Sequence, residues 1–283
     1  MNKKVKSVLR YVMSVILAFF ITALVIVNVS KATILDKNYI LNKLDKTGYY
    51  VKIFDFVKDN FKNHIQQSGL DESVLDNLIT QEKVEADTKI IITNMYNNVH
   101  EEISTEDIRE KLNKSIEEQT RGMLITTEQK KDINKFIDDI CNEYLLGIAH
   151  FNTEKEIYSV FDKAKNIIEI LNKVSLVGIA ITAVLLMTIC MNRPYKFFVF
   201  TGISLFASGL FFTIVNIYIN IKINVQAITI LNDAFSFTLR EVIETILNQI
   251  NQKGILFLCV GFAFILIPTT IHTYIKNKKY EQN

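Results

Sequence analysis

Residues 152–191 read NTEKEIYSVFDKAKNIIEILNKVSLVGIAITAVLLMTICM, and this stretch decides the fold that we expect. Its first half is charged and amphipathic, whereas every residue from Val174 to Met191 is apolar, Gly, Ser or Thr. Because no proline separates the halves, the pattern predicts one helix that leaves an external domain and enters a bilayer. Apolar residues at steps of three and four predict a seam that packs against another helix; they are Ile157, Val160, Ala164, Ile167, Leu171 and Val174.

Three further apolar runs are long enough to cross about 30 Å of hydrocarbon at about 1.5 Å per residue. For the first of them a cleavable signal peptide is the alternative, because Ser30-Lys31-Ala32 resembles a cleavage site. The length of that run favours an uncleaved anchor. With residues 174–191, the predicted transmembrane helices are 9–29, 197–220 and 255–275.

Basic residues predict the orientation of the four spans. Lysine and arginine concentrate in the amino terminus (1–8), the turn 192–196 and the tail 276–283. The positive-inside rule places these segments in the cytoplasm, and four spans bring them to one side. We therefore expect a multi-pass plasma-membrane protein with both termini cytoplasmic. Residues 30–173 and 221–254 are then extracytoplasmic.

The segment 30–173 is predicted to be an all-α ectodomain of five to seven helices. It has no proline, and each of its glycines precedes an apolar residue, as in the left-handed cap that ends many helices. Thr126 with Gln129 predicts a capping box at a helix start. These glycines are Gly48, Gly69, Gly122 and Gly147. Apolar residues at helical spacing form three stripes. The stripes are Tyr50, Ile53, Phe54, Val57, Phe61 and Ile65; Ile108, Leu112 and Ile116; and Ile133, Phe136, Ile137, Ile140 and Tyr144.

The segment 221–254 is too apolar and too regular for a loop. Val225, Ile228 and Leu231 are expected to continue the third span outward, and Thr238 with Glu241 predicts a second capping box. We expect a short helical hairpin that packs against the ectodomain and leads into the fourth span.

Composition excludes some classes of function. The 283 residues carry a formal net charge of +2, but residues 31–173 contain 20 basic and 26 acidic residues. Such an acidic domain argues against nucleic-acid binding, which needs clustered Lys and Arg. Of the three cysteines only Cys141 lies in this domain, so it cannot form an internal disulfide. External exposure without disulfides is typical of a bacterial envelope.

No pattern identifies a catalytic, cofactor-binding or metal site. No metal-ligand spacing, nucleophile motif or phosphate-binding loop is present, and His64, His100 and His150 are scattered singly. We therefore predict that the protein is not an enzyme and holds no cofactor. Adjacent acids are expected on different helix faces as solvated charge; they are Glu101-Glu102, Glu117-Glu118 and Asp138-Asp139.

Polar and small residues in the spans are interpreted as packing features. His272 is expected at the interface, and Pro268 to be accommodated by the hydroxyls of Thr269 and Thr270 rather than to form a gate. Small residues let helices approach closely; the predicted faces are Gly202, Ser204, Ser208 and Gly209 on the third span and Gly178 with Thr182 on the second.

One span, a large external domain and three further spans resemble the topology of permease subunits of the FtsX and MacB type. That resemblance implies an ATPase partner, engaged by a cytoplasmic segment between spans two and three. Here that segment is only Asn192-Arg193-Pro194-Tyr195-Lys196. The external domain is also similar to the sensor domain of bacterial chemoreceptors, whose second span continues into a signalling helix, whereas this chain turns back. Neither resemblance identifies a family.

The sequence thus predicts a non-enzymatic integral membrane protein of a bacterial cell envelope. Its helical ectodomain binds a partner or ligand and is rigidly coupled to the spans. The expected contacts are the lipid bilayer and a protein partner, with no nucleic acid. The alternative is a membrane-transport component or small pore with the ectodomain as gate. Its lining would be Ser, Thr and Asn residues of spans two to four.

Overall fold

A computed structural model describes residues 3–68, 70–99, 101–149, 155–223, 225–229 and 233–281. All regular secondary structure in these residues is helical, which confirms the all-α prediction. The chain divides into two compact units, which are described separately. We call residues 1–36, 164–228 and 240–283 the span unit, and residues 37–163 and 229–239 the helical domain.

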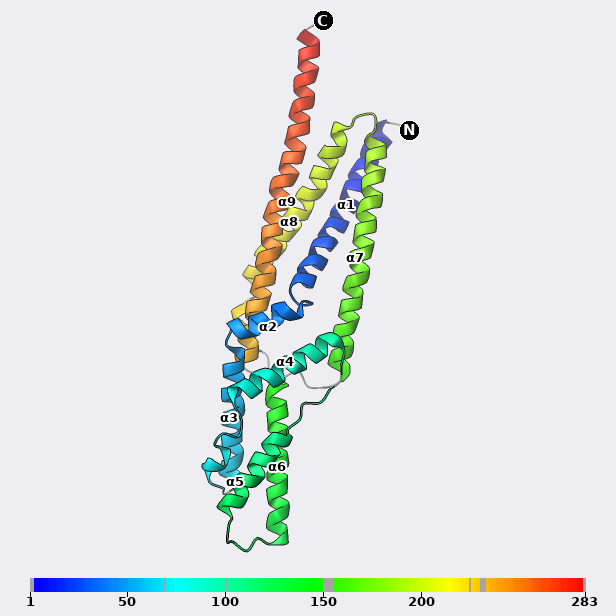
Figure 1. Cartoon of the computed structure of the whole chain (residues 1–283). Helices are drawn as coiled ribbons and strands as arrows, with labels where there is room; N and C mark the ends of the chain where they lie inside the picture. Colours follow the sequence, from blue (N-terminus) through cyan, green and yellow to red (C-terminus); the bar gives the residue numbers. More distant parts are fainter. Residues whose placement is uncertain are drawn as a thin grey trace. The chain divides into compact units, whose positions relative to one another are not determined.

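Four long helices contain apolar stretches that are long enough to cross a membrane. They are compatible with a multi-pass membrane protein, as the apolar runs predict. α7 is unbroken, as expected from the stretch that contains it, although Asn152–Glu154 lie outside the described residues. The four helices are α1 (Lys3–Ala32), α7 (Lys155–Cys190), α8 (Tyr195–Lys222) and α9 (Asp233–Glu281) (Figure 1).

Three residues of the apolar seam predicted on the first half of α7 are exposed, and the packing of this seam against another helix stays a prediction. Val160, Ile167 and Val174 are 64%, 56% and 51% exposed. A face of smaller residues is buried instead, because it admits a neighbouring helix more closely. A Cβ added at Gly178 would lie 2.5 Å from Cζ of Phe20 in α1. The other buried residues of this face are Ser175, Thr182, Leu186 and Cys190.

The small residues of α8 form two opposite faces rather than the single face that we expected. Residues two positions apart differ by about 200° around a helix, which separates Gly202 from Ser204. The glycines face α9: a Cβ at Gly202 would lie 2.8 Å from the Gly261 carbonyl oxygen, and one at Gly209 would lie 2.7 Å from that of Gly254. Backbone-to-backbone contact therefore joins α8 to α9.

The serine face of α8 joins it to α1 through buried hydrogen bonds. The Ser14 and Ser204 hydroxyl oxygens lie 2.9 Å apart, and the Ser204 hydroxyl is 2.8 Å from the Ser14 carbonyl oxygen. Ser208 donates to the Ala18 carbonyl at 3.0 Å. These hydroxyls are therefore bonded between helices.

Three further polar side chains of the spans have structural partners. The buried Arg10 of α1 donates to the Ile189 carbonyl at 3.1 Å, which satisfies an acceptor in the last turn of α7. His272 is exposed and stacks on Tyr195 with ring centroids 4.0 Å apart. α9 continues through Pro268, and the Thr269 hydroxyl bonds the Ile265 carbonyl.

The helical domain is built around the predicted stripes. Val57 on α3 and Gly147 on α6 bring these neighbouring helices together (Figure 1), since a Cβ at Gly147 would lie 2.4 Å from Cγ2 of Val57. The stripe residues are buried in one core, with Phe54 and Ile133 partly buried against it. The helices of this domain are α2 (Lys37–Lys46), α3 (Tyr49–Ser68), α4 (Gln81–Asn97), α5 (Glu106–Gln119) and α6 (Thr127–Ile148), with the short 3₁₀ helix η1 (Glu72–Leu75).

The glycines of this domain have two different roles. Gly48 and Gly122 have φ of +64° and +89°, the left-handed conformation predicted for a helix end. Gly147 instead lies inside α6 as a packing notch, so its prediction as a cap is wrong. Gly69 lies outside the described residues. The capping box of Thr126 is present, with Gln129 N donating to its hydroxyl oxygen at 3.2 Å.

The chain between α8 and α9 differs from the expected hairpin. α8 ends at Lys222, and the 3₁₀ helix η2 (Val225–Ala227) follows, so the third span is not continued as a helix. α9 begins at Asp233, which places Thr238 inside it instead of at a cap. The start of α9 belongs to the helical domain, because Ala234 enters its core and the Thr238 hydroxyl oxygen lies 2.9 Å from that of Thr47.

Candidate ligand groove of the helical domain

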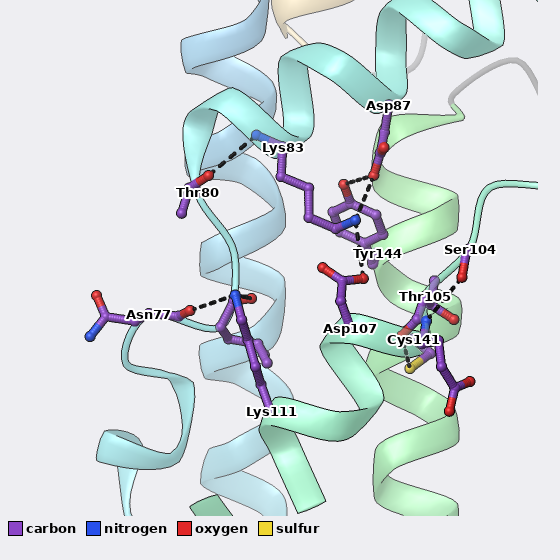
Figure 2. A network of polar contacts seen from close by, with 12 residues as sticks. Asn77, Thr80, Lys83, Asp87, Ser104, Thr105, Asp107, Lys111, Cys141 and Tyr144 are labelled. Carbon is purple, nitrogen blue, oxygen red and sulfur yellow. Dashed lines mark hydrogen bonds and ion pairs between the residues drawn. The ribbon is translucent and has the colours of Figure 1, made fainter. Parts of the chain in front are cut away.

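A polar network joins three helices of the helical domain (Figure 2). Thr80 caps α4, its hydroxyl oxygen accepting from Lys83 N at 3.3 Å. Lys83 and Asp87 are four residues apart and therefore lie on one face of α4. Asp107 comes from the first turn of α5, and Tyr144 from the last turns of α6.

Lys83 lies at the centre of this network. Its Nζ is 3.1 Å from Oδ2 of Asp87 and 3.1 Å from Oδ1 of Asp107, and it lies 5.6 Å from the centroid of the Tyr144 ring. The Tyr144 hydroxyl donates to Oδ2 of Asp87 at 2.6 Å. Tyr144 is fully buried and Asp87 nearly so. One buried carboxylate is thus held by a cation and a phenol together.

The surroundings fix the protonation states of two members. Burial alone would lower the pKa of Lys83, but the hydrogen bonds and charges of Asp87 and Asp107 outweigh it and raise that pKa. Burial, followed by the hydrogen bond to Asp87, raises the pKa of Tyr144 far above its usual range. Lys83 is therefore an ammonium and Tyr144 a neutral phenol at neutral pH. Neither is poised to act as a base or nucleophile.

A groove of about 610 Å³ adjoins this network. One wall is α4, and the other is the non-helical segment 101–105. Asn94, which is only 7% exposed, connects the two walls by donating from Nδ2 to the Glu101 carbonyl at 3.4 Å. The lining consists of Lys83, Asp87, Lys89, Ile90, Thr93, Asn94, Glu101, Glu102, Ile103, Ser104 and Asp107.

The groove carries more negative than positive charge. Its lining contains four carboxylates and two ammonium groups. Both ammonium groups have partners, because Lys83 bonds Asp87 and Asp107, and Lys89 bonds Glu85. Glu101 and Glu102 are exposed, and these two carboxylates supply the excess negative charge of the groove. This lining favours a ligand with positive charge and some apolar surface, since Ile90 and Ile103 also contribute.

The adjacent acids of the sequence have different environments. Glu101 and Glu102 were expected on different faces of a helix, but their segment is not helical and both line the groove. Asp138 bonds Arg109, with Oδ1 and Nη2 2.6 Å apart. Glu117 and Glu118 are exposed, as expected of solvated charge.

The remaining candidate residues do not converge on this groove. His64 lies 3.4 Å from Glu143, and His100 and His150 lie outside the described residues. Cys141 is buried, and burial raises the pKa of its thiol. In the part of the chain that the structure describes, no three His, Cys, Asp or Glu residues are grouped to hold a metal ion.

Sequence reasoning missed the groove because its walls come from a helix and an irregular segment that no motif marks. The available signal was the cap residue Thr80 followed by Lys83 and Asp87 on one helix face. Comparison with family models, curated proteins and solved structures finds no match for this chain. The groove is therefore interpreted from its own charge and geometry.

Proposed function

We propose that this chain is a non-enzymatic, four-span protein of a bacterial plasma membrane whose helical domain binds a basic segment of a partner protein outside the cytoplasm. The groove between α4 and residues 101–105 carries the proposal. It combines a surplus of carboxylates with apolar side chains, which suits a peptide that bears Lys or Arg. The buried network of Lys83, Asp87 and Tyr144 holds the groove in place before a partner binds.

Basic residues support the proposed orientation. Arg193 lies in the turn before α8 and Lys196 in its first turn, and the end of α9 contains Lys276, Lys278 and Lys279. The positive-inside rule places both with the amino terminus in the cytoplasm, and the helical domain on the other side.

Two helices support coupling between the domain and the spans. α7 and α9 each contain residues of both units and have no break where one unit ends and the other begins. We therefore expect binding at the groove to bias the spans through these helices. The exposed seam at Val160, Ile167 and Val174 offers a surface for a partner helix.

Three of the polar residues that a pore lining would use are engaged in helix packing. Ser204 and Ser208 bond the backbone of α1, and Thr182 bonds the Gly178 carbonyl of its own helix. Their burial stabilises helix packing and gives no support to a water-filled path.

Two double variants that remove the same number of charges, one in the groove and one outside it, test the proposal together with a crosslinking residue in the groove. A photo-crosslinking residue is placed at Thr93 in the full chain, in cells. We expect a specific partner whose yield falls about tenfold when Glu101→Gln and Glu102→Gln are combined, since each removes a charged contact. The control combines Glu117→Gln with Glu118→Gln on α5 and should leave the yield unchanged. No specific partner, or equal yields in both pairs, would overturn the proposal.

Cysteine labelling tests the orientation separately. An impermeant thiol reagent should label Glu102→Cys in intact cells and should label Lys278→Cys only after lysis. Native Cys141 and Cys190 are buried, and Cys259→Ser removes the exposed native thiol. Labelling of Lys278→Cys in intact cells would reverse the topology.

A further inference from the structure

α8 and α9 are in contact at regular intervals and then separate. Their glycine pairs, Gly202 with Gly261 and Gly209 with Gly254, are spaced by seven residues on both helices. One further step of seven places Asn216 on α8 opposite Leu247 on α9. Because these side chains are larger than glycine, the helices cannot remain in backbone contact there. A pocket of about 400 Å³ opens at this level of the span unit.

Polar side chains line this pocket from both helices. Asn216 and Asn220 are four residues apart on α8, and Glu244 and Asn248 are four apart on α9, so each pair lies on one helix face. Gln226, which follows α8, donates from Nε2 to Oε1 of Glu244. The complete lining is Asn216, Asn220, Ile221, Lys222, Ile223, Val225, Gln226, Glu244, Leu247 and Asn248.

The depth of the pocket follows from the length of α8. α8 contains 28 residues from Tyr195 to Lys222, which gives about 42 Å at about 1.5 Å per residue. A bilayer with its headgroups is about 40–45 Å thick. In the proposed membrane placement, the end of α8 at Lys222 therefore lies at the level of the lipid headgroups, and Asn216 lies near the edge of the hydrocarbon.

We propose that this pocket binds a phosphoethanolamine headgroup. Its lining offers one carboxylate, one ammonium and four carboxamides, so opposite charges are provided for both ends of a zwitterion. Glu244 and the carboxamide oxygens accept from the ligand ammonium, while Lys222 and carboxamide N–H groups donate to the phosphate. Ile221 and Leu247 contact the adjoining glycerol and acyl carbons.

The pocket chemistry discriminates between headgroups. Choline has no N–H group to donate to Glu244, and phosphatidylglycerol has no cation for it. Either lipid would leave the half-buried carboxylate without a ligand donor. Selectivity for the primary ammonium is therefore the distinguishing property of this site.

Lipid titration of the full chain in detergent tests this proposal. Native mass spectrometry should show phosphatidylethanolamine bound about tenfold more tightly than phosphatidylcholine or phosphatidylglycerol. Soluble phosphoethanolamine should displace bound phosphatidylethanolamine if the headgroup alone is recognised. If only the intact lipid displaces it, the acyl contacts also contribute to binding. Equal retention of all three lipids would overturn the proposal.

Two variants locate the site. Glu244→Gln should abolish the preference for ethanolamine over choline, and Lys222→Gln should weaken all phospholipids alike. Glu169→Gln on α7, which is exposed and outside the pocket, is the matched control. Asn248→Ala provides a second, uncharged change in the pocket, and circular dichroism checks that every variant folds. An unchanged headgroup preference in folded Glu244→Gln and Asn248→Ala would place lipid binding elsewhere.

Discussion

The helical domain and the span unit are both made of helices, but different contacts hold them together. In the helical domain, apolar stripes such as Ile53, Val57 and Phe61 on α3 are buried. In the span unit, close contacts of Gly202 and Gly209 and the hydrogen bonds of Ser208 join helices beside two small apolar clusters, and many large apolar side chains are exposed. Water drives apolar burial in one region, whereas lipid is as apolar as leucine and cannot do so in the other.

This difference explains where each unit contains polar groups. The helical domain holds a charged network between its helices, and Asp87 is paired twice. The span unit uses neutral hydroxyls that bond backbone carbonyls, and its buried Arg10, within α1, donates to a carbonyl in the last turn of α7. Substitutions in the two units should therefore destabilise them for different reasons and by different amounts.

The largest effect is expected from Lys83→Met. It leaves the buried Asp87 carboxylate without its cation and should lower the free energy of unfolding of the helical domain by about 3 kcal/mol. Hydrogen exchange of α4 and α6 in the full chain measures this loss. Adding Asp87→Asn should recover most of it, and a Lys83→Met protein with normal protection would contradict the role of the ion pair.

Gly261→Leu is expected to break the contact of α8 with α9. A Cβ at this position would lie 2.6 Å from Phe206 N, an obstacle that no side-chain rotation removes. Overpacking of this kind costs about 2–3 kcal/mol, which unfolding of the full chain in detergent can measure. Phe262→Leu, at the neighbouring exposed position, is the control and should have little effect. Equal stability of both variants would show that the glycine contact is dispensable.

Tyr144→Phe should cost about 2 kcal/mol at neutral pH, because a phenol-to-carboxylate hydrogen bond is lost. The folded state raises the pKa of Tyr144, so this contribution is complete below the unfolded pKa of about 10 and is lost as pH rises toward the folded pKa. The stability difference between wild type and variant should therefore shrink above about pH 10. A stability difference between wild type and variant that stays constant up to pH 11 would contradict the raised pKa of Tyr144.

Ser204→Ala should have the smallest effect, about 0.6 kcal/mol, as is typical of hydrogen bonds between spans. The variant removes the hydroxyl that contacts Ser14 and leaves the helix intact. Thr270→Ala is the control, since its hydroxyl bonds only the Leu266 carbonyl of its own helix. Detergent unfolding of both proteins would show whether the serine face contributes more than the intrahelical bond.

The sequence alone determined the helices and the four apolar stretches. Periodicity locates the stripes at Ile53, Ile108 and Ile140 because helix geometry repeats every 3.6 residues. Turn chemistry locates Gly48 and Gly122, since a left-handed backbone favours glycine. These features are local, and neighbours along the chain are sufficient to specify them.

Only the tertiary structure decided what those helices contact. It turned Gly147 from an expected cap into a notch for Val57, left the Val160–Val174 seam exposed, and brought Glu101 and Glu102 to one groove. It also separated the glycine and serine faces of α8 between two neighbours. The physical reason is that an apolar or small residue is suited to many partners. Which partner it meets depends on the packing of segments that are far apart in the sequence.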